Sequence, residues 1–311
     1  MSYEAEQLQR YNMPSRKDME ESLLKAIFNN NGVIREFGSR ESVVEELADE
    51  FHLSKEQRTA FLETVYRKEN RVKKPNLWHR LLFRVANNLA ERKFLSRPTQ
   101  TLKLTNKKEW MLTEKGFDKV LKVMGMSVEH KEDLLVKSFE VETFARKLKK
   151  KSKPTNYNPI GGKKEAKQSQ RLMKIRNRGF RQAVIEAYDY KCAVCGLKIC
   201  SPASHQWEVE AAHIVPHGFN GKDDIWNGLS LCRFHHWSFD VGWYSFDEKF
   251  NLVVSGKLGD LPDDMGKIWN YGLLKQLSAN KDGVQLPRQS KLWPDLNAVK
   301  WHRENVFGGC G

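Results

Sequence analysis

Long apolar runs are missing from this chain of 311 residues. A membrane-spanning helix needs about 20 consecutive apolar residues, so no membrane span is expected. The first residues, MSYEAEQLQRYNMPSRKDMEESLL, lack the basic start and apolar core of an export signal. A G-x-x-x-x-G-K-[ST] loop is also missing, which excludes a P-loop nucleotide triphosphatase. We therefore expect a cytoplasmic protein without membrane contact.

Acidic residues are too few to balance the basic ones. The chain has 39 Asp and Glu against 53 Lys and Arg, which gives a formal net charge of +14. Thirteen Lys or Arg and one acid, Glu165, lie between Arg146 and Arg178. Such a run is often only a solvated linker, but its place directly before the motif described next favours contact with phosphates. The excess charge favours a polyanion as partner.

Cysteine is scarce too, and its distribution is not that of a disulfide framework. Residues 191–242 hold four of the five cysteines and five of the nine histidines. Cys192-x-x-Cys195 forms one pair, and Cys232-x-x-His235 forms a second. Two such pairs supply the four ligands of a closed, structural zinc site. Two unrelated pairs of buried thiols are the alternative, although paired x-x spacings are uncommon.

Other cysteines and histidines receive no metal role. Cys200 and His205 lie in a loop that contains Ser and Pro. His217 is expected to be a surface or phosphate-contacting residue, and Cys310 is expected to be exposed. Cysteines that are expected to bind a metal and not to form disulfides favour a reducing compartment, which agrees with the cytoplasm.

A second set of residues in the same stretch favours a chemical role. Residues 207–215 alternate as a strand does, and a proline ends the run, so His213 is expected at a strand end. Asn227 follows fourteen residues later, within WNGLSLC. His236 and Asp240 are four residues apart and therefore share one face of a helix. We predict that His236 and Asp240 hold a divalent cation. His213 then stands opposite as a base, and Asn227 braces the loop between them.

This arrangement resembles the HNH, or ββα-metal, nuclease family, whose motif is matched by His213, Asn227 and His236. The resemblance covers residues 170–255, and EAAHIVP, NGLSLC and HHWSFDVG are most similar to HNH domains of restriction endonucleases, including the McrA-like group that cuts modified DNA. It implies a phosphodiester hydrolase that uses Mg²⁺ or Mn²⁺ beside the structural Zn²⁺. A neutral imidazole can accept a proton near neutral pH, and a cation can stabilise charge on the phosphate.

The chain departs from the family pattern at Ala212, where many HNH nucleases carry Asp or His as an additional metal ligand. Glu210 projects from the same strand face and is the nearest substitute, directly or through water. One ligand of the catalytic metal is therefore left open. A catalytically inactive, zinc-containing DNA-binding protein is accordingly an alternative.

The first part of the chain predicts short helices. Apolar residues recur at helical spacing over 16–29. Ser39 and Ser54 are candidate N-caps of two further helices, and the second of these carries Phe61 and Tyr66 inward. This pattern favours a mainly helical domain.

A longer helix with a broad apolar face begins after Asn76. Segment 96–120 then predicts two short strands around Asn106 and a helix from near Thr113, which favours a winged helix. Residues 17–124 resemble the N-terminal winged-helix domain of Mrr-type restriction proteins through NLWHRLLFRVANNLAERKFL and WMLTEKG. This resemblance implies DNA contacts, and a dimerisation or docking domain is the alternative. The candidate DNA-binding residues are Arg80, Arg84 and Asn88 on the helix and Lys103, Lys107 and Lys108 on the wing.

Residues 131–148 predict another helix, and a basic linker follows it. A helix over 171–188 places Arg178 and Arg181 outward as further DNA-binding candidates. Residues 242–255 predict a hairpin that closes the small domain.

We therefore predict an α+β protein with two domains. A mainly helical, winged-helix DNA-recognition domain spans 1–130, a helix and basic linker span 131–169, and a zinc-stabilised ββα-metal (HNH) domain with a C-terminal extension spans 170–311. The expected function is metal-dependent cleavage of double-stranded DNA, modified or not, in restriction or defence. One active site per chain favours a homodimer. Nicking, homing or RNA cleavage is the alternative role.

Overall fold

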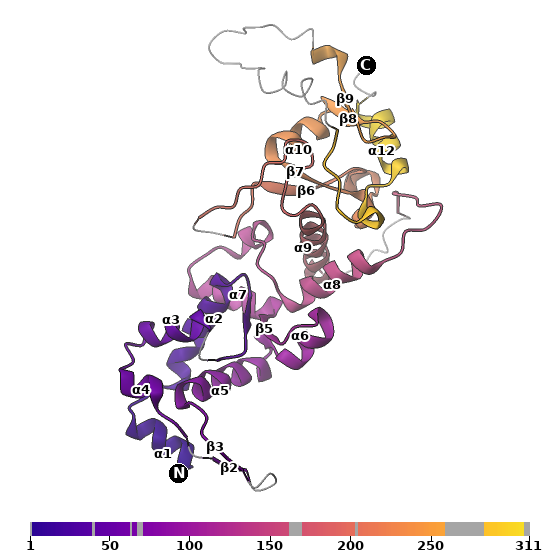
Figure 1. Ribbon diagram of the computed structural model, residues 1–311. Coiled ribbons are helices and arrows are strands. Elements are labelled where there is room, and N and C mark those ends of the chain that lie inside the picture. Colours follow the sequence, from indigo (N-terminus) through magenta and orange to yellow (C-terminus); the bar gives the residue numbers. More distant parts are fainter. Residues whose placement is uncertain are drawn as a thin grey trace, which may run out of the picture. The chain divides into compact units, whose positions relative to one another are not determined.

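The computed structural model describes residues 2–38, 41–62, 64–66, 71–161, 170–202, 205–258 and 283–307 (Figure 1). Ser39 and Cys310, named above, lie outside these residues. The chain divides into two compact units. Unit 1 is Met1–Lys131 with Val136–Glu140, and unit 2 is Glu132–Leu135 with Val141–Gly311. Among the described residues, no helix is both long enough and apolar enough to cross a bilayer.

Unit 1 is mainly helical and contains a three-stranded antiparallel sheet in the order β1-β5-β4. Its helices are α1 (Tyr3–Arg10), α2 (Arg16–Asn29), α3 (Ser42–Glu50), α4 (Lys55–Thr59), α5 (Leu77–Glu91), α6 (Pro98–Thr105) and α7 (Glu114–Val123). Its strands are β1 (Val33–Arg35), β2 (Thr64–Tyr66), β3 (Arg71–Lys73), β4 (Leu95–Ser96) and β5 (Glu109–Leu112). The mixture of helices and sheet agrees with the predicted α+β class.

Helix α5 shows how the apolar pattern produces this fold. Asn76 caps the helix, because its side chain accepts a hydrogen bond from the backbone N of His79 at 3.1 Å. The buried side chains of α5 repeat at helical spacing and pack against α2. Trp78 donates its indole N–H to the backbone oxygen of Val44 at 3.1 Å. The predicted apolar face is confirmed.

The predicted wing is wrong in its first strand. Residues 98–105 form helix α6, with Pro98 in its first turn. The backbone N of Arg97 donates to Oε1 of Gln100 at 2.9 Å, as in a capping box. Proline pre-sets the helical φ at this position, and together with the cap it outweighs the β-branched residues that favour a strand. The second predicted strand is β5. The predicted wing residues therefore lie on α6 (Lys103) and in the turn that follows it (Lys107 and Lys108).

One further predicted helix of unit 1 is too long. Ser54 caps α4 through a capping box with Gln57, as predicted, but α4 ends at Thr59. Residues 64–66 form strand β2, which pairs with β3 in an antiparallel hairpin. Phe61, predicted to point inward, is 56% exposed. Ser54 thus correctly predicts the start of a helix, but not its length. The other predicted serine cap is wrong, because the N-cap of α3 is Glu41.

Unit 2 contains an antiparallel hairpin, β6–β7, that is followed directly by a helix. Its main elements are α8 (Phe139–Lys150, in this unit from Val141), α9 (Gln170–Ala187), β6 (Val209–His213), β7 (Gly228–Cys232), α10 (Arg233–Asp240), β8 (Tyr244–Phe246), β9 (Leu252–Val254) and α12 (Leu296–His302). β8 and β9 form a second antiparallel hairpin, as predicted for residues 242–255. The predicted helix over 171–188 is also confirmed.

Part of the predicted linker belongs to the core of unit 2. Helix α8 begins at Phe139, later than predicted, and Leu148 and Tyr157 are buried in the core. Three basic side chains of this segment pair with acids, namely Lys149 with Glu186, Lys151 with Asp224 at 2.6 Å and Lys153 with Asp295 at 3.0 Å. The described part of the basic run is therefore not a freely solvated tether.

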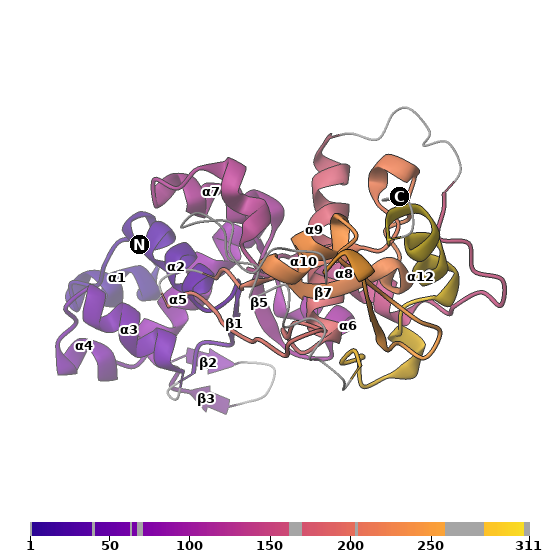
Figure 2. The same cartoon turned by 90° about the horizontal axis from the view of Figure 1, so that it is seen from above.

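Two helices hold the β6–β7 hairpin between them. Both α9 and α10 pack against its strands. The strands lie between the two helices in Figure 1, and Figure 2 shows the same elements from above. The side chains at this junction include Phe180 and Val184 of α9, Leu229 and Leu231 of β7 and Phe239 of α10, all buried. The end of β6 and the exposed side of α10 are thereby brought to one part of the unit.

Candidate functional site

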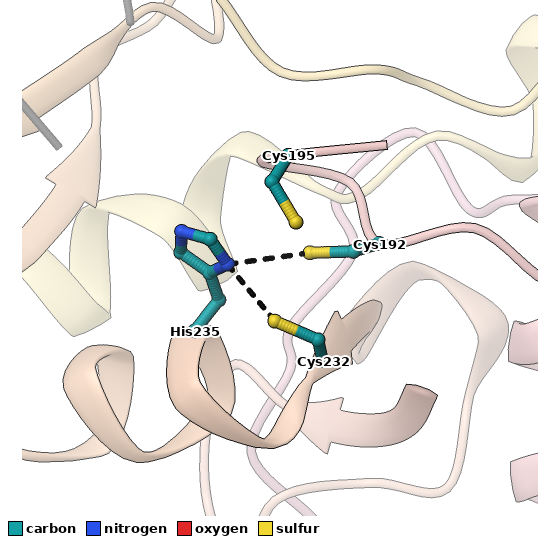
Figure 3. A group of neighbouring side chains, drawn as sticks. All are labelled: Cys192, Cys195, Cys232 and His235. Atoms are coloured by element: carbon teal, nitrogen blue, oxygen red, sulfur yellow. Dashed lines mark hydrogen bonds between the residues drawn. The ribbon is translucent and has the colours of Figure 1, made fainter. Parts of the chain in front are cut away.

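Three thiols and one imidazole point toward a common centre in unit 2 (Figure 3). Cys192 and Cys195 come from the turn after α9, whereas Cys232 ends β7 and His235 lies in the first turn of α10. Nδ1 of His235 lies 3.0 Å from Sγ of Cys232 and 3.6 Å from Sγ of Cys192. All four ligand atoms lie within 4.8 Å of one another. The structure thus brings the two predicted pairs together.

This donor set fits zinc, because three thiolates and one imidazole are the ligands of closed structural sites. Gly196 has a φ of +71°, and its N–H donates to the backbone oxygen of Cys192 at 2.9 Å, which closes the first turn. Hydrogen bonds with the thiols of Cys195 and Cys232 lower the pKa of Cys192 below its ordinary value. The thiolate is the form that binds a metal.

His213 is held at the end of β6 by three contacts. Its ring stacks on Phe180, with centroids 4.0 Å apart and an interplanar angle of 15°. Its Nε2 lies 3.1 Å from Oδ1 of Asp223. The side chain is 16% exposed, so part of the ring still faces solvent. The ring of His217 also contacts that of His213, with centroids 4.1 Å apart and an interplanar angle of 50°. The imidazole therefore has two ring neighbours and one nitrogen bound.

Asp223 is a candidate that the sequence pattern does not reveal, because it stands beside Asp224 in a polar loop. Its Oδ1 also lies 3.2 Å from Nε2 of His217, and its Oδ2 lies 3.7 Å from Nη2 of Arg176. Burial raises the pKa of Asp223, but the hydrogen bond with His213 and the charges of its neighbours lower it below the ordinary value. His213, His217 and Asp223 also offer ligand atoms within 4.8 Å of one another, which is the geometry of a metal site.

His236 and Asp240 meet on α10, as their spacing predicts. Nε2 of His236 lies 3.5 Å from Oδ2 of Asp240. Nδ1 of His236 lies 2.8 Å from Oε2 of Glu210 on β6. Burial lowers the pKa of His236, but the Glu210 hydrogen bond and the two carboxylate charges raise it above its ordinary value. Burial also raises the pKa of Asp240. One imidazole thus has a carboxylate beside each nitrogen.

Asn227 is fully buried and ties the loop to the end of β6. Its Oδ1 accepts a hydrogen bond from the backbone N of Val215 at 2.8 Å. Its Nδ2 donates to the backbone oxygens of Val215 and Lys222, both at 3.0 Å. Its own carbonyl accepts from the backbone N of Ile214 at 3.0 Å. These hydrogen bonds fix the loop that directly follows His213.

A depression of about 230 Å³ connects the two parts of the site. His213 lines it from β6, and His236 and Asp240 line it from α10. Its other lining residues include Ala211, His217 and His302. The predicted base and the predicted cation ligands therefore face the same space.

The candidate DNA-binding residues of unit 1 differ in their surroundings. Arg80 and Arg84 bind Glu4 at 2.8 and 3.4 Å. Asn88 donates to Glu20 at 3.0 Å. The three lysines predicted to lie on a wing are exposed, namely Lys103, Lys107 and Lys108. On α5, contact with DNA would thus compete with ion pairs inside the unit.

In unit 2 neither of the two arginines predicted to point outward is exposed, since the side chain of Arg181 is only 18% exposed. Arg178 is 5% exposed, because its stretch of α9 is buried. Arg181 donates to the backbone oxygen of Glu132 at 2.8 Å and lies 3.5 Å from Asp133. The sequence pattern misses these partners because they come from the segment that precedes α8.

Residues 192–247 match the model of a family described as HNH endonuclease. These residues of the chain therefore form an HNH endonuclease domain. No curated protein matches the chain. Among solved structures, the chain is similar to a "Modification dependent TagI restriction endonuclease", with 21% identity and a TM-score of 0.32 over 45% of this chain and 44% of that chain. The match thus spans less than half of that protein. The HNH domain contains all four cysteine and histidine ligands, His213, His236 and Asp240.

Proposed function

We propose that this protein is a metal-dependent DNA endonuclease of the restriction or defence type. The observation that carries the proposal is that His213, His236 and Asp240 line one depression of the HNH domain. A base and two cation ligands beside the same space are the groups that phosphodiester hydrolysis needs. The proposed substrate is double-stranded DNA, including DNA with modified bases.

His213 is the proposed general base. A phosphodiester is anionic and repels nucleophiles, so a water molecule must lose a proton as it attacks. Imidazole can accept that proton near neutral pH. Stacking on Phe180 holds the ring in place, while its partial exposure leaves room for water. Asn227 keeps the loop after His213 in position through its backbone hydrogen bonds.

His236 and Asp240 are the proposed ligands of a Mg²⁺ or Mn²⁺ ion. One imidazole nitrogen and one carboxylate oxygen form a donor set that suits such a cation. Glu210 binds Nδ1 of His236, which leaves Nε2, beside Asp240, as the ligand nitrogen. When bound, the cation would stabilise negative charge on the phosphate and the leaving oxygen. Ala212 offers no ligand atom, so water and substrate would complete the coordination.

Cys192, Cys195, Cys232 and His235 are the proposed ligands of a structural Zn²⁺ ion. Such an ion would join the turn after α9 to the start of α10. Because His236 directly follows His235, the structural site would also fix the position of the cation ligand beside it. The two sites would thus have separate tasks, one in folding and one in chemistry.

Unit 1 is proposed to be a DNA-recognition domain of the winged-helix type. The net charge of +14 and the exposed lysines around residues 103–108 favour binding to phosphates. Cleavage of both strands by chains with one HNH site each would favour a homodimer. We propose the cytoplasm as the place of action, where foreign DNA is met.

Cleavage of matched modified and unmodified DNA, with Mg²⁺, Mn²⁺ or a chelator, tests the proposal. We expect cutting that requires the cation and that His213→Ala reduces by a factor on the order of 10² to 10⁴. His205→Ala, outside the depression, serves as the control. If the intact, zinc-loaded wild-type protein cuts none of these DNA molecules, then cleavage of RNA, or DNA binding without catalysis, becomes the better explanation. If His213→Ala cuts as fast as the wild-type protein, His213 is not the general base.

A further inference from the structure

We propose that Asp223 is a positioning residue that sets which nitrogen of His213 accepts the proton, an inference that rests on the proposed function of this site. A neutral imidazole carries one proton, on Nδ1 or on Nε2, and only the other nitrogen can act as a base. Oδ1 of Asp223 lies 3.1 Å from Nε2 of His213. An ionised carboxylate only accepts hydrogen bonds. The contact therefore places the proton on Nε2 and makes Nδ1 the basic nitrogen.

The carboxylate that makes this contact is itself held in place. His217 binds the same oxygen at 3.2 Å, and Arg176 lies 3.7 Å from the other oxygen. The side chain of Asp223 is 10% exposed, so it is largely shielded from bulk water. Burial raises the pKa of Asp223, but these partners and His213 lower it below the ordinary value. Asp223 thus presents a fixed, ionised acceptor to His213.

Phe180 supplies the second restraint. Its ring is nearly parallel to that of His213, at 15°, and their centroids are 4.0 Å apart. Stacking holds the imidazole in one plane but does not distinguish its two nitrogens. The hydrogen bond to Asp223 makes that distinction. Together, the two contacts determine both the orientation of the ring and its tautomer.

The other histidine of the depression is bound through its opposite nitrogen. Glu210 lies 2.8 Å from Nδ1 of His236, whereas Asp223 lies beside Nε2 of His213. The carboxylate contacts thus leave Nε2 of His236 for the cation and Nδ1 of His213 for the proton. The pair of contacts is therefore consistent with two different tasks for the two rings.

Asp223→Asn provides the kinetic test, because it keeps the side-chain volume and removes the charge. The amide can donate as well as accept, so it no longer enforces a single tautomer. We expect kcat to fall by a factor on the order of 10² to 10⁴ while KM stays within about twofold, as for loss of an aspartate that orients a catalytic histidine. Asp223→Glu, which restores a carboxylate, should regain at least about tenfold of the lost rate.

Asp224→Asn is the matched control. It changes a neighbouring buried carboxylate that pairs with Lys151 at 2.6 Å and does not touch His213. We expect its kcat to stay within about threefold of wild type. If Asp223→Asn cleaves as fast as this control, the positioning role is overturned.

The second test does not depend on cleavage. Long-range ¹H–¹⁵N spectra of the imidazole should show wild-type His213 protonated on Nε2 and the Asp223→Asn protein with a mixture of tautomers. A wild-type proton on Nδ1 would overturn the proposal, even where the variant fails to fold. If wild type cuts no DNA but shows the Nε2 tautomer, the proposed function fails and the role of Asp223 in fixing the ring stands.

His213, His217 and Asp223 also have the geometry of a metal site. The affinity for a cation therefore distinguishes a positioning role of Asp223 from a role as a cation ligand. Calorimetric titration with Mn²⁺ should give Asp223→Asn an affinity within about threefold of wild type. A loss of about tenfold or more would place Asp223 in the cation site, as a ligand or as an outer partner of one, and would overturn the positioning role.

Discussion

Gly228 lies directly across the β6–β7 ladder from His213. A Cβ on Gly228 would lie 2.4 Å from Cγ2 of Val184 and 3.0 Å from Cζ of Phe180. Phe180 is the residue whose ring stacks on His213. The missing side chain therefore lets α9 approach the hairpin closely enough for this contact.

Gly228→Ala should destabilise unit 2 by about 1 to 3 kcal/mol, because a branched side chain and an aromatic ring must move to admit a methyl group. Cleavage should fall as well, since the same movement disturbs the stacking on His213. Urea unfolding measures the first effect. Gly256→Ala is the control, because a Cβ there would meet nothing within 4 Å. Equal stability of the two variants would show that α9 does not need this close approach.

Cys192→Ser should remove the structural zinc and unfold unit 2. A structural zinc ion contributes on the order of 10 kcal/mol to small metal domains, which is comparable with the whole free energy of unfolding of a typical domain. Zinc content by mass spectrometry and thermal unfolding by circular dichroism measure the two effects. Cys200→Ser is the control, because Cys200 is exposed and lies outside the four ligands. A Cys192→Ser protein that keeps its zinc and its stability would contradict the assignment.

Local patterns predict what depends on neighbours a few residues apart. The x-x spacing of Cys192 and Cys195 and the four-residue spacing of His236 and Asp240 are set by a turn and a helix, so both are visible in sequence. The buried face of α5 follows from its period in the same way. The short range of these interactions is the reason why the main site could be found.

Long-range packing explains what the sequence does not reveal. Asp223 resembles any loop aspartate until the fold brings it to His213. Arg178 is predicted to lie on the exposed face of an amphipathic helix, but the packing around that part of α9 buries it. In both cases tertiary context overrides a weak local preference. Residues 98–105 differ, because local signals, Pro98 and the capping box at the start of α6, outweigh their strand-like composition.

Glu210→Gln should weaken cation binding. Glu210 accepts a hydrogen bond from Nδ1 of His236, and loss of such an outer partner typically lowers metal affinity by about 10- to 100-fold. Calorimetric titration with Mn²⁺ measures this change, with Glu208→Gln on the same segment as the control. Unchanged affinity would mean that Glu210 does not orient the ligand. Complete loss of binding would mean that Glu210 is itself a ligand.

Lys107→Ala and Lys108→Ala should each weaken DNA binding and make it less sensitive to salt. Every phosphate contact that is lost lowers the slope of log affinity against log salt concentration by about 0.9. Fluorescence anisotropy over a range of salt concentrations measures the slope. Lys119→Ala is the control, since Lys119 pairs with Glu21 at 3.1 Å. Unchanged slopes for both variants would exclude this turn from the DNA interface.

His302 should make the stability of unit 2 depend on pH. It is 1% exposed, its Nε2 donates to the backbone oxygen of Phe239 at 3.1 Å, and its Nδ1 accepts from Oγ of Ser245 at 2.9 Å. Burial lowers the pKa of His302 from 6.5 to about 4. The unfolded chain therefore binds a proton at a higher pH than the folded chain does.

The sign of the effect follows from this order of the two pKa values. The contribution of His302 is complete above the unfolded value of about 6.5 and is lost as the pH falls toward 4, at a cost on the order of 3 kcal/mol. Urea unfolding at pH 7, 5 and 4 should show a steeper loss of stability for wild type than for His302→Gln, which cannot titrate. Both proteins share the other acids and histidines, so the contribution of these groups to the pH dependence cancels when the two slopes of stability against pH are compared. Parallel curves would mean that His302 takes up its proton over the same pH range in the folded and the unfolded chain, so that burial does not lower its pKa.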